Sequence, residues 1–253
     1  MNRRRTVTGF AGGLLALFLV AAPGPARAAA ALVADLSEDV IHITTGFTGT
    51  RLLLFGAVEA PGDVIIVVRG PREEVVVRRK ERRLGLWVNG PAVTFTDAPA
   101  YYAVAASDRL GGLLSQADLV RYEAGHRSIR MTPADDATNR YELVRFHNAL
   151  SRNRAAEGLY VTRTRPVEFV GERLFRADLD FPANVPVGNY TVTVMLIRDG
   201  AVVDEQKSIL IVDRTGPAAW IFERAHETPL FYGLFAVLIA LAAGWAAGAV
   251  FRR

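Results

Sequence analysis

The fold class of this chain is indicated by residues 190–212, YTVTVMLIRDGAVVDEQKSILIV. Two runs rich in β-branched residues, 190–198 and 201–212, flank the pair Asp199-Gly200. An Asp-Gly pair between two such runs is typical of a two-residue hairpin turn, because both turn positions require a positive φ. This stretch therefore predicts a β-hairpin in a mainly β protein.

A second β signal lies just upstream of the hairpin. Apolar residues at 175, 177, 179 and 181 alternate with charged residues at 176, 178 and 180, which predicts a strand with one buried face. Six further apolar runs occupy residues 40–44, 51–58, 64–69, 74–79, 86–88 and 92–96, separated by Gly, Pro, Asp and Asn. Short strands spaced in this way favour an immunoglobulin-like β-sandwich.

A helical insertion, residues 107–158, separates the N-terminal β region (29–106) from the C-terminal one (159–214). Ser107 is predicted to cap a short helix, and Thr132 is predicted to cap a longer one that carries Leu143, Phe146 and Leu150. The two β regions could complete one sandwich or form two. The six strands that precede the helices favour two subdomains that share an interface.

The N-terminus has the pattern of an export signal. A basic start is followed by an apolar stretch, Val7–Val20, and by the small-residue site Ala26-Arg27-Ala28. Residues 1–28 are therefore predicted to be a signal peptide, cleaved after Ala28 or Ala30. An uncleaved N-terminal anchor is the competing interpretation.

The C-terminus predicts a membrane anchor. Residues 230–251 are apolar and would span about 33 Å as a helix, enough to cross a bilayer. They follow a juxtamembrane segment, 215–229, and precede the basic tail Arg252-Arg253. The positive-inside rule then predicts a single-pass protein of the inner membrane, with a periplasmic body and a cytoplasmic C-terminus.

Charge and cysteine content exclude two classes of protein. The chain has 30 Lys and Arg against 26 Asp and Glu, but four of the arginines fall in the predicted signal peptide, so the mature chain would be formally neutral. Nucleic acid is therefore not an expected partner. The chain contains no cysteine, so disulfides and thiol chemistry are excluded.

Several segments together resemble an uncharacterised alphaproteobacterial family of single-span transmembrane proteins. They are LSED (36–39), ITTGFTGT (43–50), LLFG (53–56), VVRGP (67–71), RRKER (78–82) and WVN (87–89). The resemblance implies an exported β-rich body and a C-terminal membrane helix, and it implies no established activity. The anchored architecture predicts an integral-membrane partner, and the resemblance suggests a sulfite-exporter-like permease as one hypothesis for it.

No catalytic or cofactor motif is found in the sequence. The histidines at 42, 126, 147 and 226 lack metal-ligand spacing, and His42 and His147 are predicted to be a strand-surface and a packing residue. The chain is therefore predicted to be no enzyme and to bind no cofactor. A cleft that placed His42 or His147 beside an acid and a nucleophile would change that prediction.

Two sets of residues are candidate contacts. The cluster Arg78, Arg79, Lys80, Arg82 and Arg83 could bind an anion, lipid headgroups or an acidic partner, or it could be a charged edge strand that resists aggregation. Small residues at Ala240, Gly244 and Gly248 share one helix face and could allow close helix–helix contact, including homo-oligomers.

These observations predict a membrane-anchored periplasmic accessory or interaction protein. The alternative is a periplasmic module that binds or senses an anion through the arginine cluster.

Overall fold

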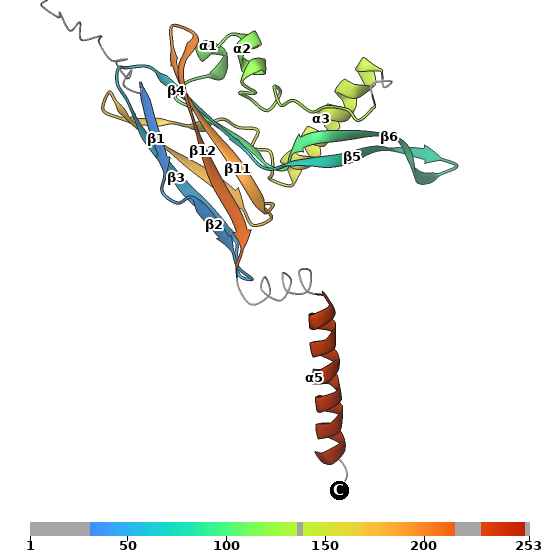
Figure 1. The fold of residues 1–253 in the computed structure, drawn as a ribbon. Helices are drawn as coiled ribbons and strands as arrows, with labels where there is room; N and C mark the ends of the chain where they lie inside the picture. Colours follow the sequence, from blue (N-terminus) through green and yellow to red (C-terminus); the bar gives the residue numbers. More distant parts are fainter. Residues whose placement is uncertain (1–30, 136–138, 216–228, 251–253) are drawn as a thin grey trace, which may run out of the picture.

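The computed structural model of the chain describes residues 31–135, 139–215 and 229–250 (Figure 1). The predicted signal peptide, nearly all of the juxtamembrane segment and the basic tail lie outside the described residues. The strands are β1 (Leu32–Leu36), β2 (Val40–Ile43), β3 (Gly49–Val58), β4 (Asp63–Arg69), β5 (Arg72–Arg83), β6 (Leu86–Pro99), β7 (Tyr102–Ala106), β8 (Arg165–Pro166), β9 (Glu168–Val170), β10 (Leu174–Pro182), β11 (Gly188–Arg198) and β12 (Ala201–Arg214). The helices are α1 (Leu110–Leu113), α2 (Gln116–Arg121), α3 (Arg140–Ala156) and α5 (Pro229–Val250).

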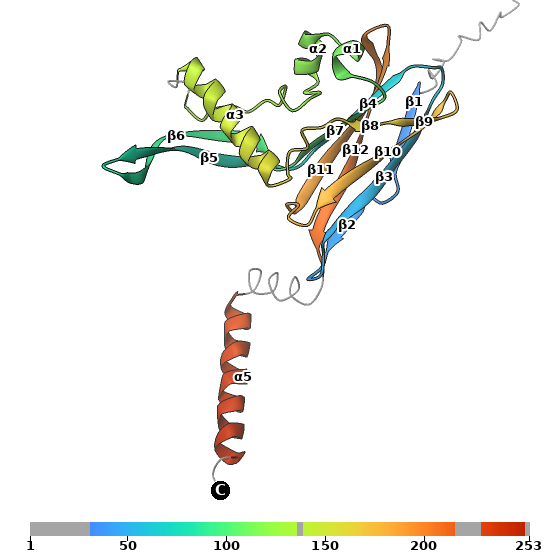
Figure 2. The same cartoon turned by 180° about the vertical axis from the view of Figure 1, so that it is seen from behind.

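Two sheets pack face to face around one core (Figures 1 and 2). The first sheet has the order β1-β3-β10-β9, and the second has the order β2-β12-β11-β4-β7-β8. Strands from both sequence regions are paired in each sheet, since β3 pairs with β10 and β4 pairs with β11. The two β regions therefore share one core, and the preference for two subdomains gives way to a single sandwich.

The second sheet departs from the immunoglobulin-like pattern. It has six strands, and two of its pairs, β2–β12 and β7–β8, are parallel. Immunoglobulin-like sheets are antiparallel. The mainly β class is thus observed, whereas the immunoglobulin-like arrangement is not.

The two strongest β predictions are confirmed. β11 and β12 form the hairpin, and its turn residues Asp199 and Gly200 have φ of 51° and 78°. On β10, Phe175, Leu179 and Phe181 are each 2% exposed, whereas the charged residues between them face outward. Both patterns are local, so the sequence alone determines them.

Both predicted helix caps are wrong, because the two hydroxyls bind partners far away in the sequence. The Ser107 hydroxyl donates to Asp63 Oδ1 at 2.8 Å and accepts from the Val64 N–H at 3.1 Å, which joins the end of β7 to β4. The Thr132 hydroxyl donates to Asp97 Oδ2 at 2.9 Å. The long helix begins instead at Arg140, after the cap Asn139.

The helix α5 covers most of the predicted membrane anchor, but its side chains are described only in part. Within the described part of the chain, no helix is both long and apolar enough to cross a membrane. For the residues that the structure describes, the prediction of a transmembrane helix at 230–251 is therefore contradicted.

Candidate functional site

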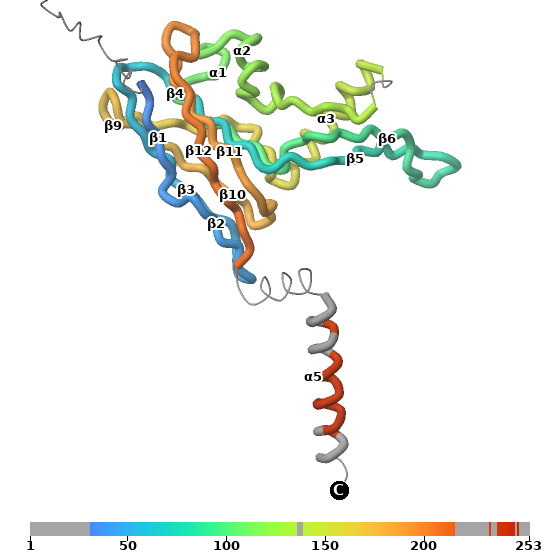
Figure 3. The backbone as a smooth tube through the Cα atoms, in the orientation of Figure 1, coloured from blue at the N-terminus to red at the C-terminus, as the bar shows by residue number. Residues whose placement is uncertain are grey.

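A projecting arm is the most distinctive feature outside the sandwich. The β5–β6 hairpin extends beyond the two sheets, and α3 packs along it (Figures 1 and 3). We call β5, β6 and α3 the arm. Its small separate core consists of Val77, Val93, Phe95, Ala98, Phe146 and Leu150. The spacing of Phe146 and Leu150 on α3 is therefore explained by packing against the hairpin.

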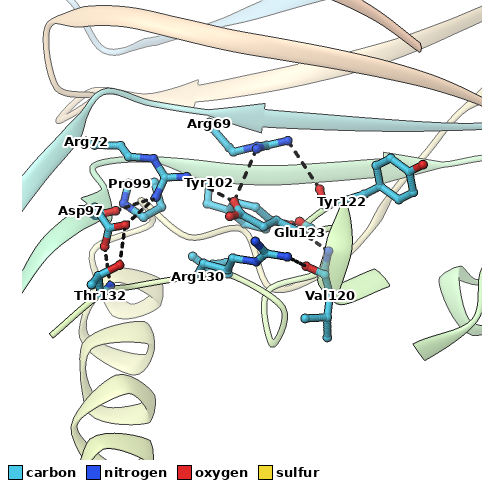
Figure 4. A network of polar contacts seen from close by, with 12 residues as sticks. Arg69, Arg72, Asp97, Pro99, Tyr102, Val120, Tyr122, Glu123, Arg130 and Thr132 are labelled. Atoms are coloured by element: carbon cyan, nitrogen blue, oxygen red, sulfur yellow. Dashed lines mark hydrogen bonds and ion pairs between the residues drawn. The ribbon is translucent and has the colours of Figure 1, made fainter. Parts of the chain in front are cut away.

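A polar network fixes the arm to the sandwich (Figure 4). Glu123 follows α2, and its side chain is 8% exposed. Its Oε2 atom lies 3.4 Å from Nη1 of Arg69 on β4 and 3.5 Å from Nη2 of Arg72 at the start of β5. One buried carboxylate thus joins the sandwich, the arm and the loop after α2.

The backbone of the same loop is held by Tyr102. The Tyr102 hydroxyl donates to the Glu123 carbonyl oxygen at 2.5 Å and accepts from the Gly125 N–H at 2.7 Å. Burial raises the pKa of this phenol, so it remains a protonated donor. Glu123 itself has a φ of 54°, which is uncommon for a residue other than glycine. Sequence reasoning missed the network, since no motif signals a lone Glu in this conformation.

The predicted arginine cluster lies on the outer half of β5, where two of its members are paired with one acid. Arg79 Nη2 lies 2.7 Å from Glu81 Oε1, and Arg83 Nη2 lies 3.2 Å from Glu81 Oε2. The hydrogen bond from Arg79 is the main reason that the pKa of Glu81 is lowered. Arg82 Nε donates to the Gly85 carbonyl oxygen at 3.4 Å. The cluster is therefore a set of differently placed cations rather than one site.

Arg78 and Arg79 line a groove together with residues of α3. The groove has a volume of about 150 Å³, and we call it the arginine groove. From α3 it receives Arg145, Arg152 and one acid, Glu142, beside the apolar floor of Val77, Phe146 and Ala149. Four guanidinium groups and one carboxylate give it an excess of positive charge. Sequence reasoning missed Arg145 and Arg152, whose spacing of seven residues on a helix was the available signal.

A larger cavity on the first sheet is lined by equal numbers of basic and acidic side chains. It has a volume of about 330 Å³ and is lined by Arg51, Arg165, Arg176, Glu168, Asp178 and Asp180. Asp180 pairs with both Arg51 and Arg165, and Arg176 pairs with Glu168 at 2.9 Å. Because its cations are paired with its own acids, this cavity has no evident preference for a charged ligand.

The outer face of the first sheet carries an apolar hollow of about 430 Å³. The strand registers place Val33, Ala57, Leu174 and Val170 side by side in one row across β1, β3, β10 and β9. Phe55 lies in the neighbouring row and also lines the hollow. No sequence prediction identified this surface, because the pairing of these four strands is long-range.

The three described histidines lie on different elements, His42 on β2, His126 in the loop after α2 and His147 on α3. His42 is exposed on β2, opposite to the buried Ile41, and His147 packs edge-on against Phe95 with its Nε2 atom 2.9 Å from the Ile129 carbonyl oxygen. Burial lowers the pKa of His126. His226 lies outside the described residues. Among the residues that are described, no group of three His, Asp or Glu side chains could hold a metal ion.

The predicted helix-contact residues are described only in part. Ala240 and Gly244 are exposed on α5, whereas the exposure of Gly248 is not described. Their role in helix–helix contact stays a prediction.

Comparisons with known proteins place the chain in a family. No curated protein matches it. A solved structure of Spo0M, a sporulation control protein from Bacillus subtilis, is similar over 78% of this chain, with 11% identity and a TM-score of 0.27, and the chain spans about half (54%) of that structure. The family model described as "Putative transmembrane protein (Alph_Pro_TM)" matches residues 31–253, and the chain therefore belongs to this family.

Proposed function

We propose that this protein is a non-enzymatic accessory protein at the periplasmic face of the inner membrane, where its sandwich binds an integral-membrane protein. The observation that carries the proposal is the apolar hollow on the outer face of the first sheet. Membership of a transmembrane family supports a partner in the membrane. A sulfite-exporter-like permease is one candidate for that partner.

The composition of the hollow is unusual for the outer face of a sandwich. Residues on such faces alternate with the core residues along each strand and are normally polar. Here Val33, Val170 and Leu174 are 58%, 55% and 56% exposed, and they lie in one cross-strand row. Contiguous apolar surface of this kind marks interaction sites in soluble domains.

Charged residues border the hollow on one side. In the row that follows the apolar one, Asp35 and Arg176 flank Phe55, and Arg176 bonds Glu168 on β9. An apolar centre with a polar rim is the usual anatomy of a protein–protein interface. The hollow therefore suits an apolar side chain of a partner, with Phe55 and Leu174 as the expected anchors.

The test is photocrosslinking in intact membranes. A photoreactive residue at Leu174 is expected to capture one reproducible integral-membrane protein, whereas the same residue at Ile209 is not. Ile209 is a matched control because it is an exposed apolar residue on β12 of the second sheet. Capture of the same protein from both positions, or of none from Leu174, would contradict the proposal.

A pair of substitutions separates binding from folding. Phe55→Ser with Leu174→Ser should abolish recovery of the partner from mild detergent. Because both side chains are exposed, the free energy of unfolding should change by less than about 1 kcal/mol. An unaltered partner yield with the double variant would exclude the hollow as the contact.

The arginine groove favours a second candidate function, the binding of a small anion. Arg79 pairs with Glu81, but the other three of its four guanidinium groups, at Arg78, Arg145 and Arg152, have no acidic partner among the described contacts. Guanidinium groups bind tetrahedral and planar oxyanions well. The dimensions of the groove, about 150 Å³, suit a sulfate, sulfite or phosphate ion.

This second function predicts a specific loss of affinity. Arg145→Ala with Arg152→Ala should weaken the binding of sulfate or phosphate by at least about tenfold, because two of the charge-assisted contacts are removed. Isothermal titration of the full-length protein measures this. Arg109→Ala with Arg173→Ala removes the same charge from exposed sites elsewhere and should leave the affinity unchanged. Equal losses of affinity in the two double variants would show that the effect depends on net charge alone and not on the groove.

A further inference from the structure

The outer end of the arm is a solvent-exposed turn made of apolar residues. Leu84 and Gly85 connect β5 to β6, and Arg83 pairs with Leu86 as the last residues of the ladder. Leu84 is fully exposed, and Leu86 and Trp87 are 71% and 68% exposed. In both ribbon views this end points away from the sandwich (Figures 1 and 2). We call residues 84–87 the arm tip.

Leu84 is unfavourable at its position for two separate reasons. Its φ is 50°, and with Gly85 at 84° the pair forms a turn that asparagine, aspartate or glycine fits best. A leucine in this region is strained by roughly 1–2 kcal/mol. Its side chain also contacts water rather than a core. A large apolar residue that is both strained and exposed indicates a contact outside the molecule.

Basic residues precede the arm tip on β5. Residues 78–83 contain five Arg and Lys against one acid, Glu81. The carboxylate of Glu81 is paired with Arg79 and Arg83, and Arg78 lines the arginine groove, so the surplus charge near the tip lies at Lys80 and Arg82. Arg82 is the cross-strand partner of Trp87, and Lys80 is the partner of Asn89. The arm therefore has an apolar end flanked by basic residues. We call Lys80 and Arg82 the basic collar.

We propose that the arm tip inserts into the interface of an anionic lipid bilayer. Leucine and tryptophan at the tip would occupy the boundary between headgroups and acyl chains, where an amphipathic indole is favoured. The basic collar would contact the phosphates of the headgroups. Charge complementarity selects an anionic bilayer as the occupant, and membership of a transmembrane family places such a surface near the protein. The inference does not depend on the proposed partner of the apolar hollow.

The experiment measures the depth of Trp87 in the full-length protein. Trp220→Phe and Trp245→Phe leave Trp87 as the single tryptophan. This protein is reconstituted with vesicles of phosphatidylcholine and phosphatidylglycerol that carry bromine on their acyl chains. The fluorescence of Trp87 is expected to be quenched and shifted to shorter wavelength. Fluorescence equal to that in vesicles without bromine would overturn the proposal.

Leu84→Asn separates insertion from folding, because asparagine is better suited to a positive φ than leucine. The variant should melt at the same temperature or higher. The ratio of inserted to free tip should nevertheless fall about tenfold, since one apolar side chain is lost from the bilayer contact. A purely structural role for Leu84 predicts instead that the quenching of Trp87 is unchanged.

A second pair of substitutions tests the basic collar. Lys80→Gln with Arg82→Gln should reduce the quenching of Trp87 in vesicles that contain phosphatidylglycerol, and high salt should have the same effect on the unaltered protein. In pure phosphatidylcholine the substitutions should change little. Quenching that is equal in all these conditions would show that the collar does not bind headgroups and would contradict the anionic part of the proposal.

Discussion

Replacing Glu123 by glutamine is expected to loosen the arm at its base and to lower the free energy of unfolding by about 2 kcal/mol. The carboxylate lies 3.4 Å from Arg69 and 3.5 Å from Arg72. An amide removes the counter-ion of Arg69 and leaves Arg72 with Asp97 alone, at 3.5 Å. Breaking a fully buried pair costs roughly 3–5 kcal/mol. The smaller value applies here because Arg72 is 42% exposed and stays solvated. Denaturant titration measures the loss.

Hydrogen exchange locates the effect of this substitution. Amides at the start of β5 and the end of β6 should exchange faster, whereas those of β10 and β11 should not, since Glu123 joins the arm to the sandwich and lies outside its core. Glu168→Gln is the matched control, because it makes the same change in an exposed ion pair with Arg176 and should cost no more than about 1 kcal/mol. A similar cost for both variants would show that burial of Glu123 contributes nothing.

The elements that the sequence predicts well are those determined by neighbouring residues. The turn at Asp199-Gly200 requires two positive φ values, and the chain supplies two residues that tolerate them. The alternation along β10 likewise needs no information about distant strands. The same logic fails at the turn between β5 and β6, where Leu84 adopts a positive φ although its residue type does not favour it.

Long-range contacts account for what the sequence did not reveal. Ser107 and Thr132 are good helix caps by residue type, but their hydroxyls bond to Asp63 and Asp97, on strands remote in sequence. A local rule cannot anticipate a competing partner that only folding brings close. The single core has the same origin, because β3 and β10 pair although more than 100 residues separate them.

In the candidate sites, too, the sequence reveals what neighbouring residues determine and misses what long-range contacts determine. The cluster from Arg78 to Arg83 is visible as a run of cations, yet its separation into groove and collar depends on the direction of each side chain along β5. Arg145 and Arg152 join the groove only because α3 packs on the hairpin through Phe146 and Leu150. The apolar hollow is assembled from four strands whose neighbours are fixed by the sandwich as a whole.

A second large effect is expected from Tyr101→Ala, which should lower the free energy of unfolding by about 3–5 kcal/mol. Tyr101 lies between β6 and β7 and is fully buried. Its ring is stacked 5.2 Å from that of Phe181 and lies 5.8 Å from that of Tyr190, measured between centroids. Its hydroxyl donates to the Asp180 carbonyl oxygen at 2.7 Å, so the side chain joins the second sheet to β10 of the first. The loss is large beside a total of roughly 5–15 kcal/mol for a typical protein.

Tyr101→Phe distinguishes the contribution of the ring from that of the hydroxyl. It keeps the stacking against Phe181 and leaves the Asp180 carbonyl oxygen without this donor, which should cost about 1–2 kcal/mol. The difference between the two variants in denaturant titration then measures the packing of the aromatic cluster between the sheets. If alanine and phenylalanine cost the same, the hydrogen bond and not the cluster joins the two layers. If alanine costs far more, the packing of the Tyr101 ring against Phe181 of β10, rather than the hydrogen bond, contributes most of the contact between the two sheets.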